Sequence, residues 1–512
     1  MEKINEKINK EEMKKENKNT ERVDQEILKK IPKEVREVSQ KIISQGFQAY
    51  LVGGCLRDLL LKKKPKDWDI TTNAKPKEVQ KIFPKSFYHN KFGTVVVPLK
   101  SKEIKNVEIT TFRSEENYQD KRHPEIVKFS QKIEEDLKRR DFTINALAFN
   151  LEKEKTSEII DLFGGLSDLK KGIIRAVGQP AERFKEDALR LLRAIRFSAQ
   201  LGFKIERETF SAIKENASLI EYISQERIRD ELIRIILSNN PQKAFLEMEE
   251  TGLLRFILPE LEEGIGVKQG GHHQDDVFTH SLLSLQAAAE RNFNLEVRLA
   301  ALFHDIGKPR TKDYNNQGDI TFYNHQLVSE KMTRTILRRL RFKNEIINKV
   351  CLLVREHMFV YDIGKVKEGA VRRLLRKVGQ ENIQDLIDLR VADRLGSRVA
   401  KAMPYRLRHL CYLLEKVSHD PISLKMLKIN GHQVMEILKI SPSPRVGLLL
   451  NALLVKVLDK PELNEFSLLK EELLKLNKLS DEELRKFKKK LDYKKEEEDR
   501  KIREKYHLKS EN

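Results

Sequence analysis

Two carboxylates near the start of the chain have the spacing of a site for a divalent cation beside a phosphate. The apolar residues 49–52 predict a buried strand, and Gly53-Gly54 separates this strand from a predicted helix. A glycine pair at such a junction leaves backbone N–H groups free to bind phosphate. Asp67 and Asp69 follow soon afterwards, and alternate residues of a strand face the same side. The pattern favours Mg²⁺ and phosphoryl or nucleotidyl transfer.

Further polar residues are candidates for the same site. Glu108 lies in a predicted strand at 107–112 and would add a third carboxylate, although an exposed strand glutamate is an equal alternative. Arg140, Asp141 and Asn145 could hold phosphates and ribose hydroxyls, but this short pattern is unspecific by itself.

A predicted helix beginning near 186 carries charged residues at every third position, namely Asp187, Arg190, Arg193 and Arg196. A surface helix with salt bridges is the simple alternative. Cytosine and adenine share an amino group beside a ring nitrogen, which a carboxylate and a guanidinium would match. Guanine and uracil would leave both side chains unpaired. Asp187 and Arg190 are therefore predicted to select C and A.

A second group of residues has metal-ligating chemistry. Imidazoles and carboxylates suit a borderline or hard divalent metal. An isolated histidine on an apolar helix is commonly structural, whereas an adjacent His-Asp pair there is harder to explain because burial penalises the charge. The group consists of His280, His304-Asp305, His325, His357 and Asp393.

Composition narrows the class of protein. A chain of 512 residues is too long for one core, so several domains are expected. The formal charge of +20, with 99 Lys+Arg against 79 Asp+Glu, favours a polyanionic partner such as nucleic acid, with a lysine-rich proteome as the alternative. Three scattered cysteines indicate a reducing cytoplasm. No membrane span or signal peptide is expected, and the oligomeric state is left open.

The motifs, in their order along the chain, resemble class II tRNA nucleotidyltransferases, the CCA-adding enzymes. The resemblance covers about residues 45–240 and implies an α+β fold, with a small mixed-sheet palm and a helical neck. It rests on Leu51-Val-Gly-Gly-Cys-Leu-Arg-Asp58, Asp67-Trp-Asp-Ile-Thr-Thr72, Arg139-Arg-Asp-Phe-Thr-Ile-Asn145 and Glu186-Asp-Ala-Leu-Arg-Leu-Leu-Arg193.

Roles for individual residues follow from this resemblance. It implies that Asp67 and Asp69 hold Mg²⁺ and that Asp187 and Arg190 read the incoming base. Contacts to the triphosphate are implied for Gly54, with Gly53 beside it, and for Arg57 and Arg140, and further nucleotide contacts for Arg193 and Arg196. Bacterial poly(A) polymerases share these motifs, and enzymes that add only CC or only A also remain possible.

The second group resembles the HD phosphohydrolase superfamily. This resemblance implies that His280, His304, Asp305 and Asp393 bind a first metal, and that His325 and His357 could complete a second. The metal would be Mn²⁺, Ni²⁺, Co²⁺ or Mg²⁺. The implied substrates are phosphomonoesters or 2′,3′-cyclic phosphates.

These observations predict addition of C, C and A to the tRNA 3′ end from CTP and ATP, without a template, together with phosphohydrolase activity. The alternatives are a poly(A) polymerase, a partial CC- or A-adding enzyme, or an HD phosphohydrolase whose palm only binds RNA. The expected organisation is a disordered segment (1–25), palm (26–175), neck (176–260), HD domain (261–402), helical body that would hold tRNA (403–475) and charged helical tail (476–512). Three local expectations are one helix over 26–43, a polar loop over 114–123 and a tail helix without an apolar face.

Overall fold

A computed structural model describes most of the chain as two compact units, Met1–Val354 and Arg355–Asn512, each with its own buried apolar cluster. The segment 1–25, predicted to be disordered, lies outside the described residues. The structure describes residues 27–88, 93–101, 103–118, 124–151, 159–270, 274–359, 361, 368–399, 401–418, 424 and 427–508.

A seven-stranded mixed sheet in the order β3-β4-β5-β2-β1-β8-β9 begins the first unit. Strands β2 and β5 run parallel, and the other neighbouring pairs are antiparallel. The apolar residues of β1 are buried at the middle of the sheet, as the sequence predicts. The strands are β1 (Ala49–Val52), β2 (Asp69–Thr72), β3 (Phe87–Tyr88), β4 (Thr94–Pro98), β5 (Asn106–Thr111), β8 (Leu147–Asn150) and β9 (Ile159–Asp161).

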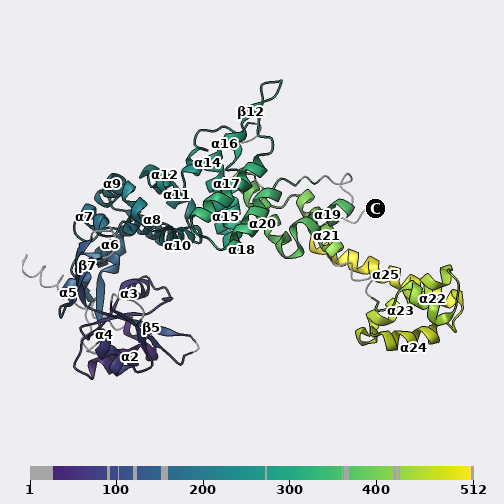
Figure 1. Ribbon diagram of the computed structural model, residues 1–512, viewed down its shortest axis with the longest axis horizontal. Helices are drawn as coiled ribbons and strands as arrows, with labels where there is room; N and C mark the ends of the chain where they lie inside the picture. Colours follow the sequence, from purple (N-terminus) through teal and green to yellow (C-terminus); the bar gives the residue numbers. More distant parts are fainter. Residues whose placement is uncertain are drawn as a thin grey trace, which may run out of the picture. The chain divides into compact units, whose positions relative to one another are not determined.

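Helices α2 (Lys33–Ile43), α3 (Gly53–Leu60) and α4 (Pro76–Ile82) pack on this sheet through a shared apolar core (Figure 1). The expectation of one helix over 26–43 is wrong, because a first helical turn ends at residue 30 and α2 begins only after Pro32. Proline lacks a backbone N–H and restricts the residue before it, which interrupts the helix.

The predicted polar loop over 114–123 is also wrong in its first half. β6 (Arg113–Tyr118) pairs antiparallel with β7 (Pro124–Phe129) in a separate two-stranded ribbon. The sequence of β6, Arg-Ser-Glu-Glu-Asn-Tyr, has no alternating apolar residues and therefore gives little strand signal. Residues 119–123 lie outside the part of the chain that the structure describes.

The rest of the first unit is helical, apart from the short pairs β10–β11 and β12–β13. Helix α8 is buried over most of its length and contacts α10 and α11. The α+β class predicted from the sequence is confirmed. These elements are α5 (Ile133–Lys138), η1 (Thr143–Asn145), α6 (Gly165–Lys171), β10 (Ile173–Ile174), α7 (Pro180–Glu186), α8 (Leu189–Leu201), β11 (Lys204–Ile205), α9 (Arg207–Asn216), η2 (Ala217–Tyr222), α10 (Gln225–Ile236), α11 (Pro241–Glu250), α12 (Leu254–Ile257), α13 (Pro259–Glu262), α14 (Val277–Glu290), α15 (Leu295–Phe303), α16 (Lys308–Thr311), β12 (Asp313–Tyr314), β13 (Ile320–Thr321), α17 (His325–Arg339) and α18 (Asn344–Glu356), whose last two residues belong to the second unit.

The second unit is helical, and α22, α23 and α24 pack around one apolar core (Figure 1). The tail helix α25 does have an apolar face, because Leu484 and Leu491 are buried in that core. Two leucines seven residues apart lie on one side of a helix but form too narrow a stripe to stand out in a charged sequence. The elements are α19 (Glu368–Val378), η3 (Gln380–Asn382), α20 (Ile383–Gly396), α21 (Tyr405–Ser418), α22 (Gly431–Leu438), α23 (Pro444–Asp459), η5 (Pro461–Leu463), α24 (Phe466–Leu476) and α25 (Asp481–Lys505).

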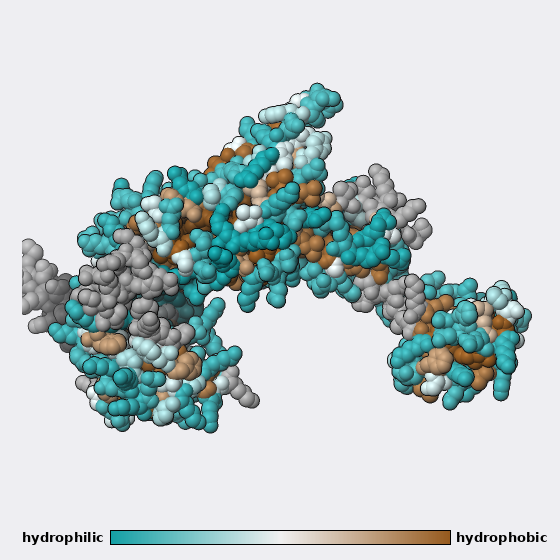
Figure 2. All heavy atoms as spheres, in the orientation of Figure 1, coloured by the Kyte–Doolittle hydropathy of each residue, from teal (hydrophilic) through white to brown (hydrophobic). Residues whose placement is uncertain are grey.

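Hydrophilic side chains cover most of the face shown in Figure 2, and apolar residues appear there only in separate patches. Within the described residues, every helix is too short or too polar to cross a lipid bilayer.

Candidate nucleotide and metal sites

The glycine pair between β1 and α3 lies directly against an arginine. Gly53 has φ +72°, a conformation that side chains rarely adopt, and a Cβ there would lie 3.1 Å from Arg140 Nη1. Both glycines, Arg57 and Arg140 line the same cavity. Backbone N–H groups at a helix start beside two guanidiniums suit a phosphate chain, as the sequence predicts.

Three carboxylates lie beside this cradle. Asp69 begins β2 and Asp67 lies in the bend before it, so the expectation that both lie on one strand holds only for Asp69. The parallel pairing of β2 with β5 places Glu108 opposite Asp69. Burial and then the charge of Glu108 raise the pKa of Asp69 to about 6, with Asp67 adding to the rise and Arg140 opposing it. Hard oxygen donors that repel one another fit Mg²⁺.

The cavity beside these carboxylates has a volume of about 470 Å³, and we call its lining the palm site. Most of the predicted nucleotide residues line it, whereas Glu108, Asp187 and Arg190 do not. Sequence reasoning gave no role to Asp58, Lys66, Phe197, Gln200 and Arg234, although Asp58 lies within the first recognised motif and Lys66 adjoins the second. The predicted residues in the lining are Gly53, Gly54, Arg57, Asp67, Asp69, Arg140, Asp141, Asn145, Arg193 and Arg196.

A chain of hydrogen bonds joins the sheet region to helix α8 within this site. Arg57 Nη1 donates to Asn145 Oδ1 at 2.9 Å, and Asn145 Nδ2 donates to Asp141 Oδ1 at 3.1 Å. Arg193 Nε then donates to Asp141 Oδ2 at 2.9 Å. Burial opposes ionisation of Asp141, but the Arg193 guanidinium holds its pKa well below the ordinary value. Asp141 is therefore a charged link between the two parts of the site.

Three guanidiniums surround the buried ring of Phe197. The Cζ atoms of Arg57, Arg193 and Arg196 lie 5.2, 5.5 and 4.2 Å from the ring centroid. Arg196 Nη1 also donates to buried Glu231 at 2.9 Å. Burial, followed by the charge of Arg193, lowers the pKa of Arg196 to about 9. The ring thus separates like charges and helps to fix their positions.

The two predicted base-reading residues have partners inside the protein. Arg190 Nη1 donates to Glu186 Oε2 at 2.7 Å, and its Nη2 donates to the Arg139 carbonyl at 2.8 Å. Asp187 Oδ2 accepts from Arg227 Nη2 at 3.0 Å. Base reading by this pair would require these partners to be exchanged for the base, and it stays a prediction.

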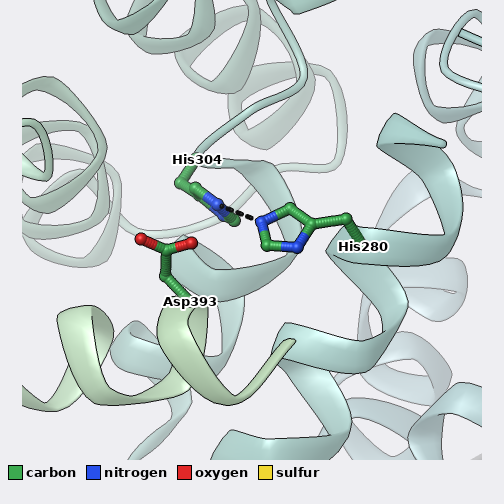
Figure 3. Close-up of side chains that lie close together, drawn as sticks. All are labelled: His280, His304 and Asp393. Carbon is green, nitrogen blue, oxygen red and sulfur yellow. Dashed lines mark hydrogen bonds between the residues drawn. The ribbon is translucent and has the colours of Figure 1, made fainter. Parts of the chain in front are cut away.

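Three histidines and one aspartate of the first unit form a buried cluster, which we call the histidine site. His280 lies on α14, His304 and Asp305 follow α15, and His325 begins α17. The Nε2 atoms of His280 and His304 lie 3.1 Å apart (Figure 3). Asp305 Oδ2 lies 3.3 Å from His304 Nε2 and 3.5 Å from His280 Nε2, and its Oδ1 lies 3.2 Å from His325 Nε2.

Backbone carbonyls determine how two of these rings present their nitrogens. His304 Nδ1–H donates to the Ala301 carbonyl at 2.9 Å, and His325 Nδ1–H donates to the Phe322 carbonyl at 2.8 Å. Because a carbonyl only accepts, the neutral ring then carries a lone pair on Nε2, which faces Asp305. Lone pairs directed at a carboxylate favour a cation among them, and this orientation is typical of metal-bound histidine.

Asp305 also has a basic neighbour that sequence reasoning missed. Lys308 Nζ lies 2.6 Å from Asp305 Oδ2 and donates to Gln269 Oε1 at 2.6 Å. Burial opposes ionisation of Asp305, but His304 and then Lys308 hold its pKa well below the ordinary value. The sequence did contain a signal for this ion pair, because Lys308 follows Asp305 by three residues, a spacing at which side chains can pair.

The two remaining predicted ligands belong to the second unit. His357 is buried directly after α18, and Asp393 is half-buried on α20. Asp393 Oδ2 accepts a hydrogen bond from Arg390 Nη1 at 3.0 Å. Their roles as metal ligands stay predictions.

Comparison with known families assigns three segments of the chain. The Poly A polymerase head domain matches residues 49–175. The model described as probable RNA and SrmB-binding site of polymerase A matches 202–265, and the HD domain matches 277–397.

Two relatives and one solved structure that are similar to this chain are all CCA-adding enzymes. A CCA-adding enzyme of Ligilactobacillus salivarius is 49% identical over 220 residues, which are 43% of this chain and about half, 53%, of that relative. A CCA-adding enzyme of Enterococcus faecalis is 36% identical over 384 residues, covering 73% of this chain and 82% of the relative. The crystal structure of the Bacillus stearothermophilus CCA-adding enzyme in complex with CTP superposes with a TM-score of 0.55 at 28% identity, covering 87% of this chain and 97% of that one. The chain therefore belongs to the CCA-adding enzyme family of nucleotidyltransferases and carries an HD domain.

Proposed function

We propose that this protein adds C, C and A to the 3′ end of tRNA from CTP and ATP without a nucleic-acid template, in the cytoplasm. The observation that carries the proposal is the palm site, where a phosphate cradle, metal-type carboxylates and the arginines of α8 line one cavity. The relative from E. faecalis and the CTP complex of the B. stearothermophilus enzyme support it.

The residues of the palm site divide the work of the reaction. The terminal 3′-OH of the primer attacks the α-phosphate of CTP or ATP, and pyrophosphate leaves. Arg57, Arg140 and the backbone at Gly53 would hold the departing phosphates. Mg²⁺ bound by Asp67 and Asp69, with Glu108 beside them, would supply Lewis-acid activation of the hydroxyl and of the triphosphate. The Asp141 link keeps the base-binding helix fixed relative to this cradle.

Selection of the base is assigned to Asp187 and Arg190. Each would release an internal partner, Arg227 or Glu186, and pair with the amino group and ring nitrogen shared by cytosine and adenine. Arg193 and Arg196 would contact the nucleotide from the same helix.

Incubation of the protein with each labelled nucleoside triphosphate and a tRNA lacking its 3′ CCA tests this proposal. We expect two C residues, then one A, and no addition to a tRNA that already ends in CCA. Continued addition of A would indicate a poly(A) polymerase, and addition of CC or A alone would indicate a partial enzyme. No addition of any nucleotide would contradict the proposal.

We further propose that the HD domain hydrolyses phosphate esters with a divalent transition metal or Mg²⁺. The resemblance to HD phosphohydrolases implies that His280, His304 and Asp305 would hold a first metal together with Asp393. His325 and His357 would complete a second with Asp305. Support comes from the Nε2 atoms that face Asp305 in the histidine site. The metal would polarise the ester and activate water.

Hydrolysis of p-nitrophenyl phosphate and of adenosine 2′,3′-cyclic phosphate, measured with Mn²⁺, Ni²⁺, Co²⁺ or Mg²⁺, tests this second activity. We expect metal-stimulated hydrolysis that is lost in His304→Ala. Bound metal without hydrolysis of any ester would contradict the activity while leaving the metal site in place.

A further inference from the structure

A basic and aromatic pocket of about 240 Å³ lies within the second unit and shares no lining residue with the palm site. Arginines of α20 and α21 line it, and the described residues of its lining include no carboxylate. The charged and aromatic members are Phe359, Tyr361, Arg390, Arg394 and Arg406. Such a lining favours an anionic ligand with a flat aromatic part.

The guanidinium of Arg394 retains bonding capacity inside the protein. Its Nη2 donates weakly to the Lys401 carbonyl at 3.4 Å, and its Nε is buried with no hydrogen-bond partner among the described residues. A buried donor without an acceptor is costly. Arg390, one turn earlier on the same helix, donates to Asp393 at 3.0 Å. A phosphate oxygen would supply the acceptor that Arg394 Nε lacks.

The aromatic side chains provide the second half of the site. The Arg390 guanidinium lies 5.7 Å from the centroid of the Phe359 ring. The hydroxyl of Tyr361 is hydrogen-bonded to His409, which fixes the ring. Leu407 and Leu410 add apolar surface to the same pocket. Nucleobases stack on aromatic rings, and neighbouring arginines bind their phosphates.

We propose that this pocket binds one nucleotide, with its phosphate on Arg394, Arg390 and Arg406 and its base against Phe359 or Tyr361. The cavity is smaller than the roughly 300–1,000 Å³ typical of pockets that enclose a whole ligand, so it accepts one nucleotide unit whose remainder stays outside. A free nucleotide and the unpaired end of an RNA both present this chemistry. The proposal does not depend on CCA addition, and because Arg390 bonds Asp393, a proposed ligand of the HD metal, it is tested by binding and not by hydrolysis.

Calorimetric titration of the full chain with adenosine 2′,3′-cyclic phosphate, and separately with a single-stranded RNA hexamer, tests the pocket. Arg394→Ala should weaken binding by about tenfold or more, because it removes a charge-assisted contact. Phe359→Leu should weaken it by a similar factor through lost stacking. Arg394→Lys, which keeps the charge but loses Nε, should give an intermediate effect. Arg376→Ala on α19 removes an exposed arginine outside the pocket and should leave Kd unchanged.

The two ligands identify the source of the nucleotide. Weakening for the cyclic nucleotide supports a free nucleotide, and weakening for the hexamer alone supports an RNA end. Unchanged Kd for both ligands in Arg394→Ala and Phe359→Leu, with unaltered thermal unfolding, would overturn the proposal. Loss of cyclic nucleotide binding in Arg57→Ala or in His304→Ala, with binding kept in Arg394→Ala, would place that probe in the palm site or the histidine site and would also overturn it.

Discussion

The palm site and the histidine site are both suited to divalent metals, but they differ in exposure. Asp67 is exposed and Asp69 half-buried at the edge of a cavity of about 470 Å³, whereas His280 and His304 are each only 1% exposed. An open carboxylate site lets a metal arrive with the triphosphate and leave with pyrophosphate. A closed imidazole site, fixed by backbone carbonyls, suits a metal that stays in place.

The charge balance of the two sites differs in the same way. Burial and neighbouring carboxylates raise the pKa of Asp69, while imidazoles and Lys308 hold the pKa of Asp305 below its ordinary value. Burial and carboxylate repulsion outweigh the attraction of Arg140 at Asp69, whereas the Lys308 ammonium lies 2.6 Å from Asp305 Oδ2. The palm site therefore depends on its metal for electrostatic balance more strongly than the histidine site does.

Removal of one palm carboxylate should change nucleotide addition more than any other substitution considered for the two sites. Asp69→Ala should lower nucleotide addition by about a thousandfold or more, because catalysis by metals supplies several kcal/mol. Hydrolysis by the HD domain should stay near normal. Glu103→Gln removes an exposed carboxylate paired with Lys64 and is the matched control. Near-normal nucleotide addition by Asp69→Ala would contradict the assignment of Asp69 as a Mg²⁺ ligand.

Changes at the base-reading pair should have a smaller and more selective effect. Arg190→Ala or Asp187→Ala should reduce the preference for CTP and ATP over UTP and GTP by about tenfold to a hundredfold, because a charged hydrogen bond is worth about 1.5–3 kcal/mol. Triphosphate affinity should change less. Arg207→Ala on α9 is an exposed control. If both variants still prefer CTP and ATP over UTP and GTP, residues other than Asp187 and Arg190 recognise the base.

The Asp141 link should contribute modestly to the stability of the palm. The pKa of Asp141 is depressed in the folded state, so its carboxylate stabilises the fold at neutral pH, and this contribution is lost as pH falls through and below the ordinary value of about 4. Asp141→Asn should lower the free energy of unfolding by about 1–3 kcal/mol at pH 7 and by less near pH 3.

Urea unfolding followed by the fluorescence of buried Trp68, the sole tryptophan, reports on the palm core. Asp230→Asn, at an exposed pair with Arg229, is the control. If Asp141→Asn lowers the free energy of unfolding as much at pH 3 as at pH 7, the packing of the Asp141 side chain, and not its charge, accounts for its contribution to stability.

Sequence reasoning succeeded where local pattern determines structure. The apolar β1, the glycine pair and the strand of Glu108 all follow from short-range signals, and the fold class followed from motif order. The Pro32 break was readable but was outweighed by apolar periodicity across it. Strand β6 was not readable, because its polar sequence has no hydrophobic period.

Contacts between distant segments account for the rest. No local pattern links Phe197 on α8 to Arg57 on α3, or Arg190 to the Arg139 carbonyl, because tertiary packing brings these segments together. The orientation of the His304 ring depends on a backbone carbonyl, which a sequence does not display. Residue types thus predicted which side chains do chemistry, while their internal partners required the structure.

Metal content measured together with nucleotide addition tests the independence of the two sites most directly. The double variant His304→Ala, Asp305→Ala should lose tightly bound transition metal and ester hydrolysis. Its addition to a short RNA primer, which makes few contacts outside the palm, should remain within a fewfold of normal. A loss confined to affinity for whole tRNA would still fit, since the HD domain could contact the RNA. Loss of addition to the short primer, in a variant whose Trp68 unfolding is unchanged, would contradict the separation of the two chemistries.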